Sequence, residues 1–314
     1  MYLIRCKSRP PFGTVRYTGK MADDRDEIRI GKHTVRRMGY GAMQLAGPGA
    51  FGPPKDRTEA LAVLRSAVDR GVNHIDTAQY YGPAVVNELI HEALHPYPDD
   101  LILISKVGAK RNSQGAWLPA SSPSELRVGV LENLTTLHTD YLAAVNLRLP
   151  DLPAGKSVDE QLFVDQIGAL AELKQEGIVG GIGLSNIGSA LLEAALKITE
   201  VVCVQNPFNI IDRKSLEVVR RCEAESITFV PFFPLGSGFS TVNPVLTAPS
   251  VTTTAARLGV TPAQVALAWL LDVSSNTAII PGTSSLQHLE ENLAAEQLVL
   301  DQQAKIDLGL PSDT

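Results

Sequence analysis

Short apolar runs alternate with amphipathic segments along almost the whole chain. From residue 28 onward, each run rich in Val, Ile and Leu is followed by a segment with helical spacing of apolar residues. Most of these runs are continuous rather than alternating, which is typical of parallel strands covered on both faces. Eight of them are predicted to be strands, at residues 37–41, 72–76, 101–106, 141–148, 178–184, 201–205, 227–232 and 277–281. Before them, residues 27–36 predict a β-hairpin with Gly31-Lys32 at its turn.

The segments between the predicted strands carry signals for the beginning and the end of helices. Three of them open with a capping box, in which two side chains satisfy the free backbone amides of the first turn. These boxes are SPSE (122–125), SVDE (157–160) and TPAQ (261–264). Gly71 and Gly177 follow helical patterns and fit the left-handed position that ends a helix.

Strands that alternate with helices predict right-handed βαβ units and a parallel sheet. Eight such units close into a barrel of about 250 residues, which matches the length of the repeating pattern. The expected fold is therefore of the α/β class, a (β/α)8 TIM barrel with an N-terminal β-hairpin. The alternative is an open, doubly wound sheet, but the first crossover (44–57) lacks the GxGxxG motif that this fold usually carries.

We expect residues 27–314 to form a single barrel domain. The basic segment that precedes residue 21 lacks the continuous apolar stretch of a secretory signal. Residues 1–26 are expected to be a disordered extension or a misassigned start, with Met21 as an alternative initiator. A transit peptide is the other interpretation.

The composition narrows the possible functions. A formal net charge of −6 argues against binding to nucleic acid or to an anionic membrane, and no run of about 18 apolar residues could span a bilayer. The three cysteines lie far apart without CxxC spacing, so no disulfide framework is expected and the cytoplasm is the simplest location. HEALH (91–95) matches the HExxH pattern of zinc proteases, but it lacks a third ligand, so we expect no metal site.

Polar or aromatic residues stand at the ends of most predicted strands, where a barrel builds its active site. The three longest connections, 43–57, 107–121 and 236–248, also follow strands and would lie on the same face. A helix cap or a loop position could explain each of these residues alone, but not their common placement. They are Asp76, Lys106, Arg148, Ser185, Asn186, Gln205 and Phe232.

The most informative of these patterns is DTAQYY (76–81), which begins with Asp76 and ends with Tyr81. In a barrel, Lys106 lies on the neighbouring strand, so Asp76 would pair with it and hold it in place. A Lys cation beside a Tyr hydroxyl favours the phenolate, and we therefore expect the pKa of Tyr81 to fall below about 10. Tyr81 could then give or take a proton near neutral pH, with Tyr80 as the competing tyrosine.

The chain resembles the aldo-keto reductase family in six stretches that span nearly all of it after residue 34. They are GVNHIDTAQYYG (71–82), ISKVG (104–108), GIGLSN (181–186), VQNPFN (204–209), FFPLG (232–236) and IPGTSSLQHLEEN (280–292). The resemblance implies a (β/α)8 barrel that moves a hydride between NADPH and a small carbonyl compound. It also implies that Tyr81 is the proton donor, with Asp76 and Lys106 as its partners.

The same resemblance implies a cofactor site. Ser185, Asn186 and Gln205 match residues that bind the nicotinamide carboxamide, and Phe232 matches an aromatic residue that stacks on the nicotinamide. The remaining expected cofactor residues are Pro234, Leu235, Gly236, Gly282, Thr283, Ser284, His288, Glu291 and Asn292. Some family members have Lys and Arg at the positions of Gly282 and His288, so we expect NADPH here but leave NADH open.

Arg148 departs from the family pattern, which usually has a His at the end of the fourth strand. A guanidinium can donate to a carbonyl oxygen or bind an anionic substrate, but it cannot shuttle a proton. We count Arg148 among the expected catalytic residues. Asn146 is a second candidate for that space, and a structural salt bridge is the other interpretation of Arg148.

The long loops are expected to build the substrate pocket, with Phe51, Tyr80, Trp117 and Phe239 as candidates. Within the family, residues 39–54, 145–148 and 230–236 are most similar to the pyridoxal reductases, which implies reduction of pyridoxal to pyridoxine. One alternative is a broad-range aldehyde or ketone reductase, and another is an NADPH-binding regulatory subunit that turns over slowly. The oligomeric state does not follow from the sequence.

Overall fold

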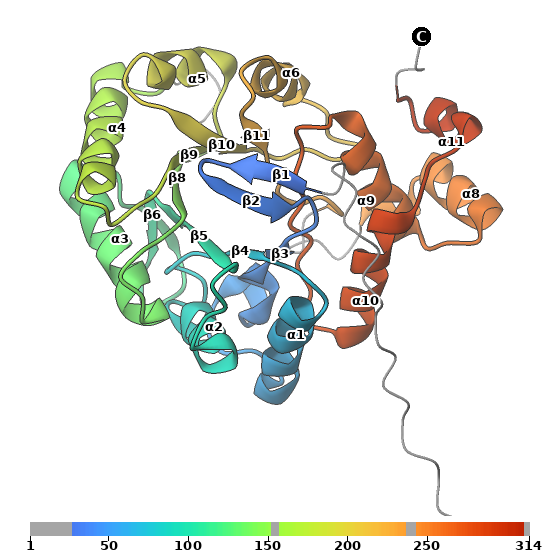
Figure 1. Ribbon diagram of the computed structural model, residues 1–314, viewed down its shortest axis with the longest axis horizontal. Helices are drawn as coiled ribbons and strands as arrows, with labels where there is room; N and C mark the ends of the chain where they lie inside the picture. The colour runs from blue at the N-terminus through green and yellow to red at the C-terminus, as the bar shows by residue number, and fades with distance from the viewer. Residues whose placement is uncertain (1–26, 152–156, 237–242, 311–314) are drawn as a thin grey trace, which may run out of the picture.

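The computed structural model describes residues 27–151, 157–236 and 243–310, and it has the barrel architecture expected from the sequence. Seven parallel strands form one sheet in the order β3, β4, β5, β8, β9, β10, β11. Helices surround this curled sheet on its outside (Figure 1). The strands are β3 (Tyr40–Gly41), β4 (His74–Asp76), β5 (Ile102–Val107), β8 (Ala144–Arg148), β9 (Ile182–Ser185), β10 (Val201–Gln205) and β11 (Thr228–Phe229).

Residues 277–281, the eighth expected strand, close the barrel through isolated bridges rather than as a regular strand. Thr277 is bridged in parallel to Phe229 on one side, and Ile279 is bridged to Met38 on the other. The Ile279 amide donates to the Arg37 carbonyl oxygen at 2.7 Å. These bonds join the two edges of the sheet, so the alternative of an open sheet is wrong.

The helices of the outer ring follow the predicted order. The capping boxes that open α3 and α9 are both present. The capping box predicted at 157–160 is wrong. Helix α4 begins at Glu160, and its N-cap is Asp159, whose carboxylate accepts a hydrogen bond from the Leu162 amide. The helices are α1 (Arg57–Asp69), α2 (Val85–Leu94), α3 (Pro123–Leu137), α4 (Glu160–Gln175), α5 (Ser189–Leu196), α6 (Leu216–Ala224), α7 (Pro244–Thr247), α8 (Pro249–Leu258), α9 (Pro262–Val273), α10 (Leu286–Ala294) and α11 (Gln302–Asp307). No helix in the described part of the chain combines the length and the apolar character that crossing a membrane would require.

The expected N-terminal hairpin closes one end of the barrel. It consists of β1 (Glu27–Ile30) and β2 (His33–Arg36), and it lies across the centre of the ring in Figure 1. Ile30 and Val35 pack against apolar side chains of the barrel strands, including Ile102. The hairpin thus shields the apolar interior of the barrel from water at the end opposite the loops that follow the strands.

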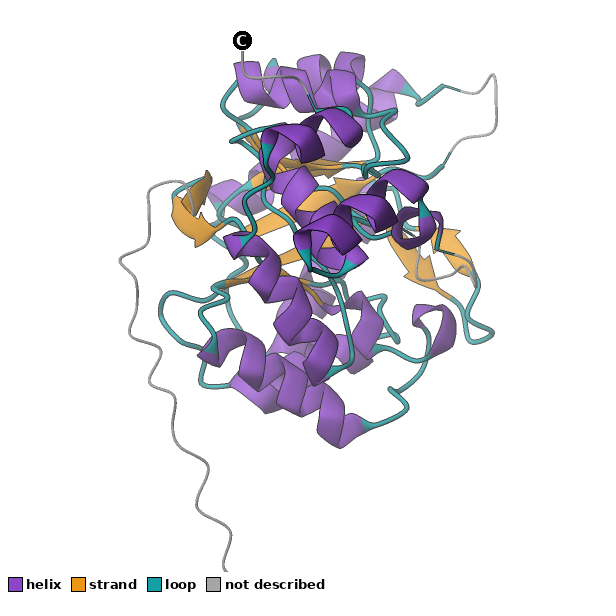
Figure 2. Cartoon of the chain, turned by 90° about the vertical axis from the view of Figure 1, so that its right-hand side faces the viewer, coloured by secondary structure: helices purple, strands orange, loops and turns teal. Residues whose placement is uncertain are grey.

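The long connections are more ordered than the sequence pattern suggested. Residues 107–121 contain a second hairpin, β6 (Ala109–Arg111) and β7 (Trp117–Pro119), where only a loop was expected. Figure 2 shows the two small hairpins on opposite sides of the molecule. The first connection contains two short 3-10 helices, η2 (Ala42–Leu45) and η3 (Pro48–Ala50). The third connection includes residues 237–242, which lie outside the described residues.

His74 is an unusual residue within the apolar wall. Its ring is buried, and neither nitrogen has a hydrogen-bond partner of normal geometry among the described residues. A Cβ at Gly39 would lie only 2.1 Å from this ring, so Gly39 is required to leave room for it. Burial lowers the pKa of His74 to about 4, and the nearby Arg36 backbone opposes the shift slightly.

The buried His74 is expected to make the protein sensitive to acid. An unfolded His has a pKa of about 6.5, so stability should be independent of this group at higher pH. Between about pH 6.5 and 4 only the unfolded chain binds the proton, and the free energy of unfolding should fall by about 3 kcal/mol. Urea unfolding at several pH values should show this slope in the wild type, and it should be smaller in His74→Phe, which keeps a buried ring. An unchanged slope in that variant would contradict the assignment.

Candidate active site

A cavity of about 150 Å³ opens where the strands end, and it gathers the residues expected to be catalytic. The strand ends are aligned by the register of the sheet, in which Gly41 pairs with Asp76 and Arg148 pairs with Ser185. The cavity is lined by Gly41, Met43, Gln44, Asp76, Tyr80, Tyr81, Lys106, Trp117, Arg148, Ser185, Phe232, Phe233, Pro234, Leu235, Gly236, Ile280, Pro281 and Gly282. All four residues expected to be catalytic are therefore at one place.

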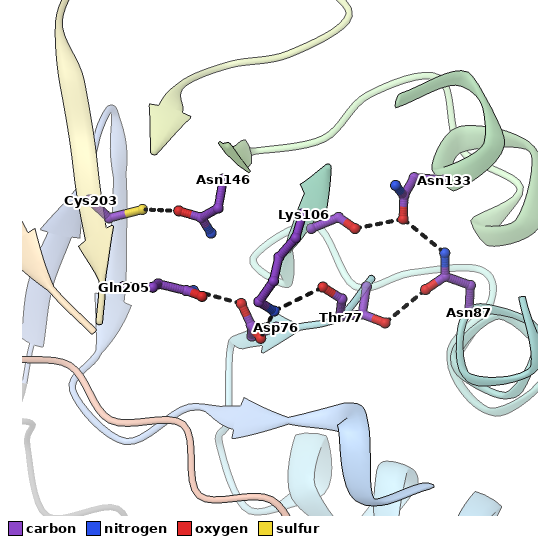
Figure 3. A network of polar contacts seen from close by, with 9 residues as sticks. Asp76, Thr77, Asn87, Lys106, Asn133, Asn146, Cys203 and Gln205 are labelled. Atoms are coloured by element: carbon purple, nitrogen blue, oxygen red, sulfur yellow. Dashed lines mark hydrogen bonds and ion pairs between the residues drawn. The ribbon is translucent and has the colours of Figure 1, made fainter. Parts of the chain in front are cut away.

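Asp76 and Lys106, which both line this cavity, form a buried ion pair. The Lys106 ammonium donates to Asp76 Oδ1 and, at 3.1 Å, to the Thr77 carbonyl oxygen. The other carboxylate oxygen of Asp76 accepts from Gln205 Nε2 at 2.7 Å (Figure 3). Each of the two charges thus has a charged partner and a further hydrogen bond, as buried charges require.

A short turn after β4 carries Tyr81. Its backbone amide donates to the Ala78 carbonyl oxygen at 3.0 Å, and Gly82 follows with a φ of +97°, which favours glycine. The Gly82 amide donates to the Ala50 carbonyl oxygen, and the Gly52 amide donates to that of Gly82. The first long connection is therefore bonded directly to the turn that carries Tyr81.

The expected lowering of the pKa of Tyr81 is wrong for this arrangement. Burial raises the pKa of Tyr81 above its ordinary value, and the nearby Asp76 carboxylate raises it further. Arg148 lowers it, but not enough to reverse the shift. Lys106 lies 5.2 Å from the centroid of the Tyr81 ring, and its charge is already paired with Asp76. Tyr81 is therefore held as a neutral phenol at neutral pH.

An aromatic row extends from Tyr81 to the outer rim of the cavity. Tyr80 packs edge-on against both Tyr81 and Trp117, with ring centroids 5.4 Å and 5.3 Å apart. The Arg111 guanidinium lies 4.0 Å from the centre of the Trp117 ring. Tyr80 and Trp117 line the cavity as expected, and the buried Tyr80 hydroxyl has no partner among the described residues.

Two expected substrate residues are not placed in this cavity. Phe51 lines a neighbouring hollow that it shares with Arg111 and Trp117. The Arg111 side chain holds the first and second long connections together there, since it donates to the Gly49 and Gly115 carbonyl oxygens. Phe239 lies outside the described residues.

Arg148 is only loosely tied to the protein. Its guanidinium donates to the Leu149 carbonyl oxygen at 3.2 Å and lies 3.8 Å from Asp151, which is largely exposed. A salt bridge, the other interpretation of Arg148, is thus present as a weak pair with the exposed Asp151. Asn146 does not lie against the cavity, because its side chain is buried inside the barrel beside Cys203 (Figure 3).

The expected cofactor residues divide into three groups. Ser185, Phe232, Pro234, Leu235, Gly236 and Gly282 line the cavity. Gln205 and Asn186 form the second group and do not line the cavity. Gln205 Oε1 is buried without a partner among the described residues, and the Asn186 side chain donates to the Asp151 carboxylate at 2.9 Å. The third group is Thr283, Ser284, His288, Glu291 and Asn292, which lie in the loop before α10 and on that helix, away from the cavity. Within it, Ser284 and His288 are exposed and Asn292 is buried.

The loop before α10 approaches the first strand closely. A Cβ at Gly282 would lie 2.5 Å from the Gly41 carbonyl oxygen, so this position admits no side chain without a shift of backbone. Ser285 caps α10 without a side-chain hydrogen bond, and its own amide donates to Thr283 Oγ1. The first turn of α10 thus has backbone amides that no capping side chain occupies, which suits an anion.

Sequence reasoning missed six residues that line the cavity. Met43 and Gln44 belong to η2 in a connection that was identified only as long, and Phe233 has a φ of +55°, which is rare for a residue other than glycine. No sequence signal shows that backbone conformation. The six are Gly41, Met43, Gln44, Phe233, Ile280 and Pro281.

The HEALH motif lies elsewhere on the molecule. His91 is on α2, His95 follows the end of that helix, and the His91 ring stacks on His138 with centroids 4.0 Å apart. The described residues contain no group of three or more His, Cys, Asp or Glu side chains arranged to hold a metal ion.

Comparison with known proteins agrees with this geometry. The model of the aldo/keto reductase family matches residues 37–307. This chain belongs to that family. It is 50% identical over 278 residues to pyridoxine 4-dehydrogenase of Escherichia coli, covering 87% of this chain and 94% of the relative. The expected family is thus confirmed, and the protein is an oxidoreductase of carbonyl compounds.

Solved structures of family members share the fold. A thermostable aldo-keto reductase crystallised with the inhibitor epalrestat is 27% identical, with a TM-score of 0.74 over 90% of this chain and 98% of that one. A Klebsiella pneumoniae aldo/keto reductase crystallised with NADP and acetate is 23% identical, with a TM-score of 0.73 over 91% and 96% of the two chains. The barrel expected from the sequence is confirmed.

The Asp76–Lys106 pair is expected to matter for stability as well as chemistry. Lys106→Met leaves the Asp76 carboxylate buried without its cation and should lower the free energy of unfolding by about 3–5 kcal/mol. The double variant Asp76→Asn/Lys106→Met removes both charges and should recover most of that loss. Urea unfolding at neutral pH measures both, and a double variant no more stable than Lys106→Met would show that the pair is not the cause.

Proposed function

We propose that this protein reduces pyridoxal to pyridoxine with NADPH, and that Tyr81 donates the proton. The observation that carries the proposal is the placement of Tyr81. It is held as a neutral phenol in the cavity wall, above the Asp76–Lys106 pair and near the Arg148 guanidinium. A group that must give up a proton at neutral pH has to carry that proton beforehand. Tyr81 does so, because burial raises its pKa from an ordinary value that is already about 10.

The residues present fit a nicotinamide dinucleotide. Phe232 places an aromatic ring in the cavity wall, on which a nicotinamide could stack. The buried Gln205 Oε1 has no hydrogen-bond partner among the described residues, and a carboxamide N–H could donate to it. The first turn of α10 offers free backbone amides for a phosphate, and the Klebsiella relative of the same fold was crystallised with NADP. When bound, the reduced cofactor supplies the hydride.

The charges around the cavity suit the proton transfer. Tyr81 donates its phenolic proton to the carbonyl oxygen and becomes a phenolate. The Asp76 charge opposes that phenolate, but Lys106 neutralises most of the Asp76 charge, and Arg148 stabilises the phenolate directly. A proton from solvent then restores the phenol.

Pyridoxal fits the chemistry of this cavity. Asp76 and Lys106 neutralise each other, so Arg148 is the remaining charged residue in the cavity lining, and its pairing with the exposed Asp151 is weak. Pyridoxal is a flat aromatic aldehyde with a phenolate-like oxygen next to the aldehyde. The rings of Tyr80 and Trp117 can contact its flat face, and the Arg148 guanidinium can receive its anionic oxygen. The 50% identity to a pyridoxine dehydrogenase supports the same substrate.

Turnover tests the proposed function directly. Oxidation of NADPH should be rapid with pyridoxal and slower with nitrobenzaldehyde or with NADH in place of NADPH. Tyr81→Phe should lower kcat on the order of 10²–10⁴-fold without weakening cofactor binding, because only the transferable proton is lost. Tyr80→Phe is the matched control and should have a much smaller effect.

Each other outcome has a defined meaning. Turnover of nitrobenzaldehyde alone would favour a broad-range reductase, and no turnover with either aldehyde would favour a regulatory subunit. Equal effects of the two Tyr→Phe changes would refute the assignment of Tyr81.

Arg148 should determine the preference for substrates that carry an anionic oxygen. A charged hydrogen bond contributes about 1.5–3 kcal/mol. In an assay above the pKa of the salicylaldehyde phenol, Arg148→Met should therefore lower kcat/KM for salicylaldehyde relative to its O-methyl ether roughly 10–150-fold. Arg148→Lys keeps the charge and should retain part of the preference. Measuring the ratio of kcat/KM for the two aldehydes separates recognition from a general loss of activity, and an unaltered ratio in Arg148→Met would exclude this role.

A further inference from the structure

Two asparagines of the outer helices form a buried amide pair behind the active site. Asn133 of α3 uses all its hydrogen-bonding capacity: Nδ2 donates to Gln79 Oε1 at 2.9 Å and to the Gly129 carbonyl oxygen at 2.8 Å. Its Oδ1 accepts from Asn87 Nδ2 of α2 at 3.0 Å and from Ser105 Oγ of β5 at 2.5 Å. Asn87 and Asn133 are both fully buried.

This pair, the Asn87–Asn133 pair, is bonded to the turn that carries Tyr81 at two points. Thr77 Oγ1 donates to Asn87 Oδ1 at 2.7 Å (Figure 3). Asn133 Nδ2 donates to Gln79 Oε1, as described above. On its other side the Thr77 carbonyl oxygen accepts from Lys106. The turn is thus held between the outer helices and the ion pair, two to four residues before Tyr81.

Helix α3 is shaped for this contact. Gly129 lies one turn before Asn133, and a Cβ there would come within 3.1 Å of Gln79 Nε2 and of the Val107 side chain. Glycine in the middle of a helix is unfavourable relative to alanine. The close approach of the Gln79 side chain therefore gives a physical reason for this residue.

We propose that the Asn87–Asn133 pair positions Tyr81 for proton transfer by fixing Thr77 and Gln79. None of these four side chains needs to touch the substrate. Asn133 has all its hydrogen bonds made within this buried network, so a displacement of the turn would leave a buried polar group without a partner. A proton donor displaced by about 1 Å can lose on the order of 10²-fold in rate, so the network acts on kcat. The kinetic part of this inference rests on the proposed function.

The test compares two Thr→Val changes that delete hydroxyls bonded to the same Asn87 side chain. Thr77→Val removes the bond between Asn87 and the turn. Thr136→Val removes the 2.9 Å bond that Asn87 Nδ2 donates to Thr136 Oγ1 of α3, which does not involve the turn. Thr77→Val should lower kcat roughly 10–100-fold with little change in the Kd of NADPH. Thr136→Val should change kcat less than about twofold, and Thr77→Ser, which keeps the hydroxyl, should restore most of the loss.

A second measurement does not depend on turnover. Hydrogen exchange of the amides of residues 77–82 should become faster in Thr77→Val and stay unchanged in Thr136→Val. If the wild type reduces no aldehyde, the proposed function fails, but hydrogen exchange still tests whether the pair holds the turn. Equal kcat in the two Val variants, a loss confined to cofactor binding, or unchanged exchange in Thr77→Val would each overturn the inference.

Discussion

The buried ion pair between Asp76 and Lys106 is the interaction on which the rest of the active site depends. Two charges taken out of water are tolerated only when each is paired and further hydrogen-bonded. Gln205 of β10 donates the further hydrogen bond to Asp76, and the Thr77 carbonyl oxygen accepts the further one from Lys106. Strands β4, β5 and β10 and the turn after β4 must therefore meet in one arrangement. The barrel, with all strand ends on one face, brings them together.

The same pair determines the electrostatics of the cavity above it. Because Lys106 is already engaged, it does not make Tyr81 acidic in the free protein, and burial keeps that side chain protonated. If Tyr81 is the proton donor, as we propose, the proton transfer has to be driven by the charge that develops on the substrate oxygen during the reaction. Arg148 is near enough to lower the pKa of Tyr81, and it cannot itself act as the proton donor.

Much of the fold could be predicted from the sequence because the signals involved are local. Apolar runs, two capping boxes and terminal glycines located the strands and helices, and the ends of the strands located Asp76, Lys106 and Arg148. The eighth strand was placed correctly, but its irregular bridging depends on contacts with Met38 and Phe229 that no local pattern encodes. The capping box predicted at 157–160 failed because Asp159 caps the same helix terminus instead.

The site was less predictable where it depends on long-range contacts. The pKa of Tyr81 was misjudged because burial outweighs a cation that is already paired, and burial is a property of the folded chain. Asn87 and Asn133 carried no signal at all, since an Asn within a helical pattern is ordinarily an exposed residue. Only the structure shows that these helices turn polar side chains inward, toward the turn that carries Tyr81.

The contact between Gly41 and Gly282 constrains how the cofactor phosphate can be held. The Gly41 carbonyl oxygen occupies the space that a side chain at residue 282 would need, and the Tyr40 hydroxyl binds the Thr283 carbonyl oxygen at 2.5 Å. A lysine at residue 282 would therefore require the loop to move away from β3. A phosphate at this end of the barrel would be bound by backbone amides of α10 and by hydroxyl groups instead. Such a site discriminates less by charge than one with Lys and Arg side chains, so we expect a weaker preference for NADPH over NADH than those side chains would give.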